Sequence, residues 1–112
     1  MDCIFCKIAN HEIPGKFVLE TDEVMVLHDI APKAKVHLLA IPKQHIVTLN
    51  DLTVDNQQVM GQLSLAIAEA TKQLGIAESG YKVIINNGHN GGQAVPHLHC
   101  HVLGGEKIPS IT

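Results

Sequence analysis

Three histidines stand at every second position in an otherwise apolar stretch, at His97, His99 and His101. The sequence predicts a strand from His97 to Leu103, and a strand sends alternate side chains to opposite faces, so the three imidazoles would share one face. Two chemistries are open: a three-histidine metal site with a free position, or attack by a neutral imidazole acting as nucleophile and proton carrier. Because three such residues spread over roughly 13 Å along a strand, the spacing favours the nucleophile.

A second pattern lies near the N-terminus, where Cys3 and Cys6 form a C-x-x-C. Such a pair is compatible with a redox couple, with half of a zinc site, or with two free thiols. A zinc site needs two more ligands, and His45 and His97 are the candidates. Zinc and free thiols both remain open from these residues alone.

Three further features are compatible either with a role in the site or with a purely structural role. His37 lies between apolar neighbours and is either a hydrogen-bonded core residue or part of the site. Asp29 follows a predicted strand, where a carboxylate accepts sugar hydroxyls or simply faces solvent. The loop 87–93 contains three glycines, which suit either an anion seat or a flexible hairpin turn.

The elements that must position these residues follow from hydrophobic periodicity and from breaker residues. A long amphipathic helix is predicted from Val54 to Leu74, with Thr53 as its N-cap and Gly75 just past its end. A short helical turn and five strands complete the list: Cys3–Ile8, then Phe17–Glu20, Val24–Asp29, Val36–Ile41, Tyr81–Asn86 and His97–Leu103. This order predicts an α+β fold, an antiparallel sheet with a helix on one face.

Composition narrows the class of protein. The chain has 112 residues, 46% of them hydrophobic, which predicts one domain over residues 1–112. A net charge of −3 argues against nucleic acid as a partner, although not against a small nucleotide. We expect no membrane span and no signal peptide, and therefore a cytoplasmic protein whose three cysteines are not a disulfide framework.

The segment from Gly91 to Gly105, with its alternating histidines, closely resembles the signature of the histidine triad (HIT) superfamily. Four other segments resemble landmarks of its Hint branch in the same order: Cys3–Ile8, Glu12–Pro14, His28–Ile30 and His37–His45. The resemblance therefore covers nearly the whole chain, from residue 3 to about 105.

The resemblance implies a hydrolase or transferase that acts at the α-phosphorus of purine nucleotides, commonly on nucleoside phosphoramidates, as a homodimer whose sheets join. His99 would be the nucleophile and form a nucleotidyl-histidine intermediate that water then cleaves. His101 would bind the phosphate oxygens and stabilise charge, and His37 would support the triad from the neighbouring strand.

The resemblance also implies binding residues and a cofactor. The phosphate would contact Asn86, Gln93 and the backbone amide near Val95, and the ribose would contact Asp29. The purine pocket would comprise Ile4, Phe5, Ile8, Leu27 and Ile30. One structural zinc ion would be held by Cys3, Cys6, His45 and His97.

Two positions depart from the family pattern. Ala94 replaces a serine that is thought to assist the leaving group, and Pro96 replaces a frequent aromatic residue. Proline cannot donate to a ladder, so the last strand should begin at or after Pro96. The tail after Gly105 is also less typical, which leaves its role in specificity open.

The sequence thus predicts a Hint-like nucleoside phosphoramidase that works through His99. Three alternatives are a dinucleoside polyphosphate hydrolase, a nucleotide-binding regulatory module with little turnover, and a metal-dependent hydrolase that uses the histidines as ligands.

Overall fold

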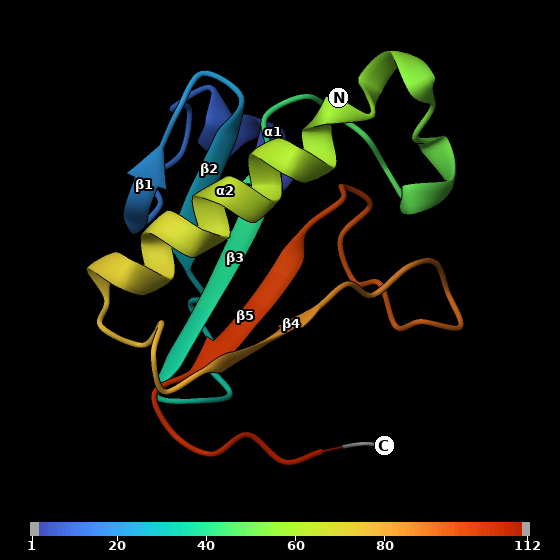
Figure 1. Ribbon diagram of the computed structural model, residues 1–112. Coiled ribbons are helices and arrows are strands. Elements are labelled where there is room, and N and C mark those ends of the chain that lie inside the picture. Colours follow the sequence, from blue (N-terminus) through green and yellow to red (C-terminus); the bar gives the residue numbers. More distant parts are fainter. Residues whose placement is uncertain (1–2, 111–112) are drawn as a thin grey trace.

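The computed structural model describes residues 3–110 and contains a five-stranded sheet between two helices (Figure 1). Its elements in chain order are α1 (Ile4–Ala9), β1 (Phe17–Glu20), β2 (Val24–His28), β3 (Val36–Pro42), the 3₁₀ turns η1 (Leu49–Asp51) and η2 (Val54–Asn56), α2 (Gln58–Gln73), β4 (Tyr81–Ile84) and β5 (Cys100–Gly104). The predicted α+β class with a long helix, a short N-terminal helix and five strands is confirmed.

All neighbouring strands of the sheet are antiparallel, in the order β1-β2-β3-β5-β4. The last strand in sequence, β5, is therefore inserted between β3 and β4. His101 pairs with Leu39 of β3 on one side and with Ile84 of β4 on the other. A central strand with two ladders holds its side chains more rigidly than an edge strand does, which suits a site that needs fixed geometry.

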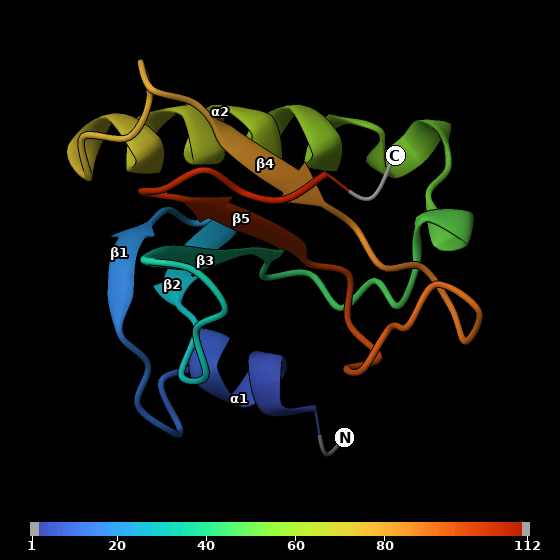
Figure 2. The same ribbon diagram turned by 90° about the horizontal axis from the view of Figure 1, so that it is seen from below.

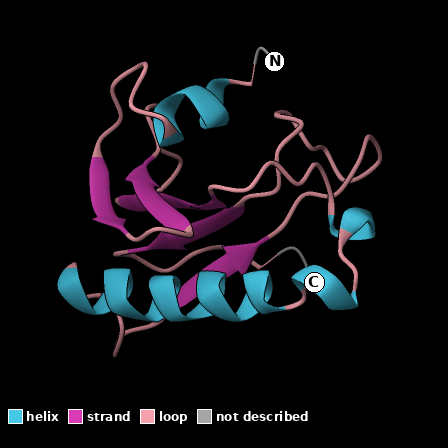
Figure 3. Ribbon diagram, turned by 90° about the horizontal axis from the view of Figure 1, so that it is seen from above, coloured by secondary structure: helices cyan, strands magenta, loops and turns pink. Residues whose placement is uncertain are grey.

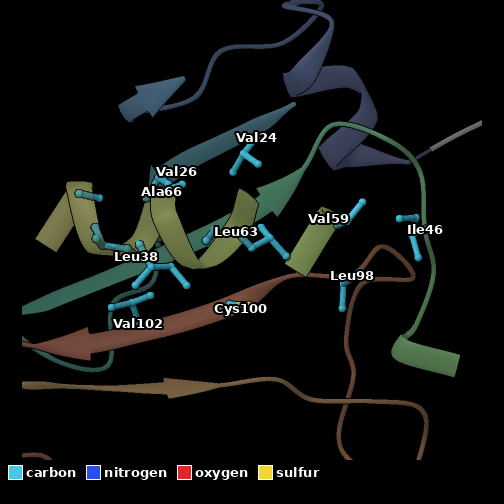
Figure 4. Packing of buried hydrophobic residues seen from close by; sticks show 13 residues of the cluster. Val24, Val26, Leu38, Ile46, Val59, Leu63, Ala66, Leu98, Cys100 and Val102 are labelled. Carbon is cyan, nitrogen blue, oxygen red and sulfur yellow. The ribbon is translucent and has the colours of Figure 1, made fainter. Parts of the chain in front are cut away.

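The long helix α2 covers one face of the sheet and forms the larger apolar core with it (Figure 4). Its buried face repeats every three or four residues, as an amphipathic helix requires. The core comprises Val59, Leu63, Ala66, Ile67 and Ala70 from α2, and Val24, Val26, Leu38, Ala40, Ile46, Leu98, Cys100 and Val102 from the rest of the chain. Burying each large aliphatic side chain contributes about 1.5–3 kcal/mol.

The predicted start of this helix was wrong, whereas its predicted end is confirmed within a residue. Thr53 caps a separate 3₁₀ turn, because its hydroxyl accepts from the Asp55 amide, and the α-helix begins only at Gln58. At the other end Gly75 has φ +73° and donates to the Lys72 carbonyl. Only a residue that tolerates positive φ closes a helix in this way.

The short helix α1 packs against the opposite face of the sheet (Figures 2 and 3). Phe5 and Ile8 are buried there against strand residues such as Leu27 and Ile41. Six residues are too few for a helix that is stable alone in water, so α1 depends on these contacts and on any further tie to the sheet.

Several predicted strand ends need correction. The strand predicted from His97 begins at Cys100, and β2 and β4 end at His28 and Ile84, short of Asp29 and Asn86. Pro96 has no amide hydrogen to donate to a ladder, and β5 begins after it, as predicted. The backbone amides of His97 and Leu98, however, donate to carbonyls outside the sheet.

Carbonyl groups outside the sheet ladder hold the segment between Pro96 and β5. The His97 amide donates to the Val95 carbonyl and the Leu98 amide to the Ile46 carbonyl at 2.6 Å. Before Cys100 the chain is therefore tied to the segment after β3 rather than to the ladder.

The C-terminal tail runs back past the edge of the sheet, and its last two residues, 111 and 112, lie outside the described part of the chain (Figure 1). Lys82 donates to the Pro109 carbonyl at 2.6 Å, and Glu106 accepts from the Lys35 amide. Within residues 3–110 no helix is long and apolar enough to cross a bilayer.

Candidate active site and metal centre

The three histidines lie on the α1 face of the sheet, even though two of them precede β5. The Phe5 ring of α1 contacts the rings of His97 and His99 edge-on, with centroids 5.8 Å and 5.2 Å away. The His99 ring lies 5.0 Å from that of His101. The intervening Leu98 belongs to the core under α2. The predicted alternation of faces therefore holds although the predicted strand does not.

The backbone fixes which nitrogen of His99 carries a proton. Nδ1 lies 2.7 Å from the carbonyl oxygen of His97. A carbonyl only accepts hydrogen bonds, so Nδ1 carries the hydrogen and donates it. In the neutral ring the lone pair is then at Nε2, the atom that can attack an electrophile or bind a proton.

A chain of hydrogen bonds fixes the tautomer of His101 in the same way. His37 Nδ1 accepts from the backbone amide of Lys33 at 3.1 Å, so neutral His37 carries its hydrogen on Nε2. That Nε2 donates to His101 Nδ1 at 3.0 Å. The remaining hydrogen of neutral His101 is therefore on Nε2, where it is available as a donor. His99 and His101 thus place a lone pair and a hydrogen-bond donor in neighbouring rings.

Asp29 lies at the end of β2 beside this chain. Its Oδ2 is 3.4 Å from His37 Nε2, and its Oδ1 accepts from the Ala31 amide at 2.8 Å. Burial lowers the pKa of His37, and the Lys33 charge lowers it further, although Asp29 opposes both. Burial also lowers the pKa of His101, with the charges of His99 and His37 acting in the same direction. Both rings are therefore held neutral at physiological pH.

The residues expected to form a purine pocket are only partly together. Phe5, Ile8 and Leu27 lie in one buried cluster on the α1 face. By contrast, the side chain of Ile4 is 48% exposed and that of Ile30 is 93% exposed.

Ile13 packs against the same cluster and was not among the predicted pocket residues. Ile13 belongs to the Glu12–Pro14 segment that resembles the Hint branch, and that resemblance could have identified it as a pocket residue. The apolar cluster on the α1 face is thus buried, whereas Ile4 and Ile30 face solvent.

The side-chain amides expected to bind phosphate are engaged with the backbone. Gln93 accepts from the Gly88 amide at 2.8 Å and donates to the carbonyls of Val47 and Val95. Asn86 donates to the Gly91 carbonyl at 2.8 Å. These contacts shape the glycine-rich loop, and a Cβ at Gly91 would lie only 2.5 Å from the Asn87 carbonyl oxygen.

A cavity formed by the described residues lies away from the histidines. It has a volume of about 770 Å³ and lies between the loop after α2 and the start of the C-terminal tail. Its lining includes Ser79, Tyr81, Lys82 and Lys107, and none of the histidines. The histidines do not line this cavity, and His37, His97 and His99 are buried on the α1 face of the sheet.

Cys3, Cys6, His45 and His97 bring their donor atoms within 4.8 Å of one another. The Sγ of Cys3 is 3.3 Å from His97 Nδ1, that of Cys6 is 3.2 Å from His45 Nδ1, and the two Nδ1 atoms are 3.2 Å apart. Bonds of about 2.0–2.3 Å in a tetrahedral zinc site give donor separations of roughly 3.3–3.8 Å. The cluster therefore has the composition and size of a closed zinc site.

The second nitrogen of His97 supports the same conclusion. Nε2 donates to the Pro42 carbonyl at 2.7 Å, which leaves the lone pair at Nδ1, facing the sulfurs. In the metal-free protein burial lowers the pKa of His97, and burial together with Cys3 raises the pKa of Cys6. Two soft sulfur donors and two imidazoles whose nitrogens lie close together are the donor set that Zn²⁺ prefers.

Asp29, His37 and His101 form a second group of possible ligands. Here the hydrogen-bond directions are wrong for a metal. If His37 bound an ion through Nε2, its hydrogen would move to Nδ1 and meet the Lys33 amide, which is itself a donor. This geometry argues against the metal-dependent hydrolase that the sequence left open.

The fold and this site define a class of protein, and comparison with known families agrees. The family model for the HIT domain matches residues 10–108, and the chain belongs to that family. Among relatives, the purine nucleoside phosphoramidase of Escherichia coli K12 is 41% identical over 107 residues, covering 96% of this chain and 90% of its own length. An uncharacterised HIT-like protein of Synechococcus elongatus is 45% identical and covers 96% and 93%.

Solved structures give the same assignment. A histidine triad protein from Clostridium difficile has a TM-score of 0.96 at 42% identity, covering 100% of this chain and 97% of its own. A HIT family hydrolase from Legionella pneumophila has a TM-score of 0.93 at 39% identity and covers 96% of each chain. The predicted family is confirmed.

Proposed function

We propose that this HIT-family protein is a purine nucleoside phosphoramidase that cleaves the bond between the α-phosphorus and nitrogen through a covalent intermediate on His99. The observation that carries the proposal is the orientation of the His99 ring, whose Nδ1 hydrogen is held by the His97 carbonyl at 2.7 Å. The free lone pair at Nε2 is the nucleophile.

The reaction consists of two displacements at phosphorus. In the first, the Nε2 lone pair of His99 forms a bond to phosphorus, and the electron pair of the phosphorus–nitrogen bond leaves with the amine, which takes a proton from water. The imidazolium that results keeps its Nδ1 hydrogen on the His97 carbonyl, which stabilises the new positive charge. In the second, water attacks phosphorus, gives up a proton and restores neutral His99, releasing the nucleoside monophosphate.

His101 binds the phosphate oxygens during both displacements. Its Nε2 hydrogen is available because His37 occupies its Nδ1 at 3.0 Å. A donor aimed at a charge that grows in the transition state contributes more than one that only binds the ground state. Asp29 is assigned to the ribose hydroxyls, and the apolar cluster of Phe5, Ile8 and Leu27 to the base.

The remaining residues that the resemblance places near the nucleotide receive smaller roles. Gln93 and Asn86 shape the phosphate loop through the contacts described above, and the Val95 amide faces the phosphate. Ile30, exposed in this structure, is assigned to the outer rim of the base pocket.

A rapid-quench experiment tests the nucleophile. The protein is mixed with adenosine 5′-phosphoramidate, quenched and analysed by mass spectrometry for an adenylyl adduct on the peptide that contains His99. We expect the adduct in wild type and in a control variant, His89→Ala, whose side chain lies exposed in the glycine-rich loop. His99→Ala should form no adduct and retain at most a few per cent of turnover. Tight AMP binding without turnover of phosphoramidates or dinucleoside polyphosphates would favour the regulatory module instead.

We further propose that Cys3, Cys6, His45 and His97 hold one Zn²⁺ with a structural role. The closed set of four donors leaves no position for substrate, so the ion contributes folding free energy rather than chemistry. The site joins α1 to the segment after β3 and to the segment before β5. It thereby leaves His99 and His101 to the substrate.

A homodimer completes the proposal. β4 lies at one edge of the sheet, and its Tyr81 and Val83 are 37% and 45% exposed. The helix α2 lies over β2 and β3 and leaves β4 uncovered (Figure 1). Pairing of β4 with the same strand of a second copy would satisfy this edge and join the two sheets. Sedimentation at micromolar concentration should show a dimer that Val83→Asp weakens.

The residues fit one HIT domain across the chain, and we propose the cytoplasm as its compartment. Cys3, Cys6 and Cys100 are all unpaired in this structure, as in proteins of reducing compartments. The negative net charge favours a small nucleotide over nucleic acid as the partner.

A further inference from the structure

Cys3 and Cys6 are arranged as a pair that can close into a disulfide without movement of the backbone. Cys3 is the N-cap of α1, its carbonyl accepts from the Lys7 amide at 3.0 Å, and Cys6 lies one turn further along. Helix geometry places Cα atoms at this spacing roughly 5 Å apart, within the range of about 4.4–6.8 Å that a disulfide needs. The two sulfurs already lie within 4.8 Å, so side-chain rotation is sufficient.

Cys6 is more accessible to solvent than the other two cysteines, since Cys3 is only 5% exposed. Cys6 is half-buried at the surface of α1, whereas Cys100 is 2% exposed and faces the core under α2. Burial raises the pKa of Cys100 to about 11 and also raises that of Cys6, so exposure to solvent is what separates the two thiols. A small oxidant should therefore meet Cys6 first, and Cys100 provides an internal control.

We propose that Cys3 and Cys6 are an oxidation site, converted by a peroxide into an intramolecular disulfide that releases α1 from the sheet. The Cys6 thiolate takes one oxygen from hydrogen peroxide, forming a sulfenic acid and a hydroxide ion. The Cys3 thiolate then attacks that sulfur and expels a second hydroxide. The two thiolates lose two electrons and the peroxide gains them.

The consequence follows from the contacts of α1. With both sulfurs withdrawn, only His45 and His97 remain as donors, and two donors do not hold an ion that needs four. The helix then loses its tie through the metal and keeps the apolar contacts of Phe5 and Ile8. Phe5 is also the residue that packs edge-on against His99. The effect on nucleotides rests on the proposed function, whereas the disulfide and the release of α1 do not.

The experiment compares the reduced, zinc-loaded protein before and after treatment with hydrogen peroxide. Peptide mapping should find a disulfide between Cys3 and Cys6 while Cys100 stays a free thiol. A metal-sensitive dye should detect one released zinc per chain, and amide hydrogen exchange should accelerate at residues 4–9. The dissociation constant for AMP should rise at least about tenfold, and reductant with added zinc should restore it.

Two variants control the result. Cys6→His retains a zinc ligand type but cannot form the disulfide, so its AMP affinity after peroxide should equal its own untreated value. Cys100→Ser should respond to peroxide as wild type does. The proposal is overturned if Cys100 oxidises first, or if the disulfide forms without faster exchange in α1. If AMP fails to bind the untreated protein, the proposed function fails while the oxidation site stands or falls on mapping and exchange.

Discussion

Two groups of histidines lie side by side on the same face of the sheet, and both are compact enough to suggest a metal. One consists of His45 and His97 with two thiols, and the other of His37 and His101 with Asp29. Distance alone does not separate them, because the histidine nitrogens are 3.2 Å apart in the first group and 3.0 Å apart in the second. What separates them is the partner of the second ring nitrogen.

In the first group that partner is an acceptor. The Pro42 carbonyl takes the Nε2 hydrogen of His97 and leaves the other nitrogen free to bind an ion. In the second group it is a donor, since the Lys33 amide occupies Nδ1 of His37 and forces the hydrogen inward, towards His101. A single backbone group thus decides whether an imidazole cluster is suited to a metal or to proton and phosphate chemistry.

The largest difference expected between the two groups is in metal binding. His97→Ala should lose its zinc and several kcal/mol of stability, because structural zinc contributes on the order of 10 kcal/mol to folding. His37→Gln should keep one zinc per chain, since its cluster is not a metal site. Metal content after gel filtration and thermal unfolding with and without chelator measure both. Loss of zinc in His37→Gln would contradict the comparison, as would a full equivalent retained in His97→Ala.

The next effect belongs to the group of Asp29, His37 and His101 alone. His101→Ala removes the donor assigned to the phosphate oxygens and should lower kcat/KM by about 10²–10³-fold, the usual effect of losing one such donor. Its zinc content and melting temperature should remain near those of wild type. Steady-state kinetics on adenosine phosphoramidate provide the measurement, and a tenfold or smaller loss would show that His101 does not stabilise the transition state.

The sequence predicted the residues of this site that form local patterns, and it missed the features that depend on contacts distant in the chain. The alternation of His97, His99 and His101 followed from periodicity. The C-x-x-C indicated half of a zinc site with His45 and His97 as candidates, and the family resemblance favoured zinc over free thiols. The strand around the histidines was misplaced by three residues, because the Leu98 amide bonds to Ile46, which is distant in sequence. The sequence did not predict that the Pro42 carbonyl and the Lys33 amide would be hydrogen-bond partners. Every residue has a carbonyl group, and nearly every residue has an amide, so the residue type does not show which of them will bond to a histidine. The position of Ile30 was not predictable either, since exposure depends on the course of the whole loop.

A smaller effect is the dependence of stability on pH. An unfolded histidine binds a proton near pH 6.5, whereas burial lowers the pKa of His37 and His101 in the folded protein. Between these values the unfolded state holds more protons, so the free energy of unfolding rises with pH and falls as pH drops below about 6.5. Each unit of depressed pKa contributes about 1.4 kcal/mol.

The matched variant isolates the contribution of His37. Protons would also compete for the proposed zinc ligands, but equally in wild type and in His37→Gln. Chemical denaturation at pH 7.5 and pH 5.5 should therefore show a smaller loss of stability in the variant. Asp29 and Lys33, the charged groups beside His37, are unchanged in this comparison. An equal loss in the two proteins would show that His37 does not titrate with folding.

The smallest expected effect concerns the leaving group. Ala94 is exposed between Gln93 and Val95, so Ala94→Ser can be accommodated without repacking. A hydroxyl near the departing nitrogen would replace water as its proton donor, and one hydrogen bond contributes about 0.5–1.5 kcal/mol, or up to about tenfold in rate. The gain should fall on adduct formation and not on hydrolysis of the adduct, because only the first step expels the amine. Single-turnover quench with the control variant Ala77→Ser, on the loop after α2, separates the steps. A gain in both steps would place the hydroxyl on the phosphate instead, and no gain would mean that Ala94 lies away from the leaving group.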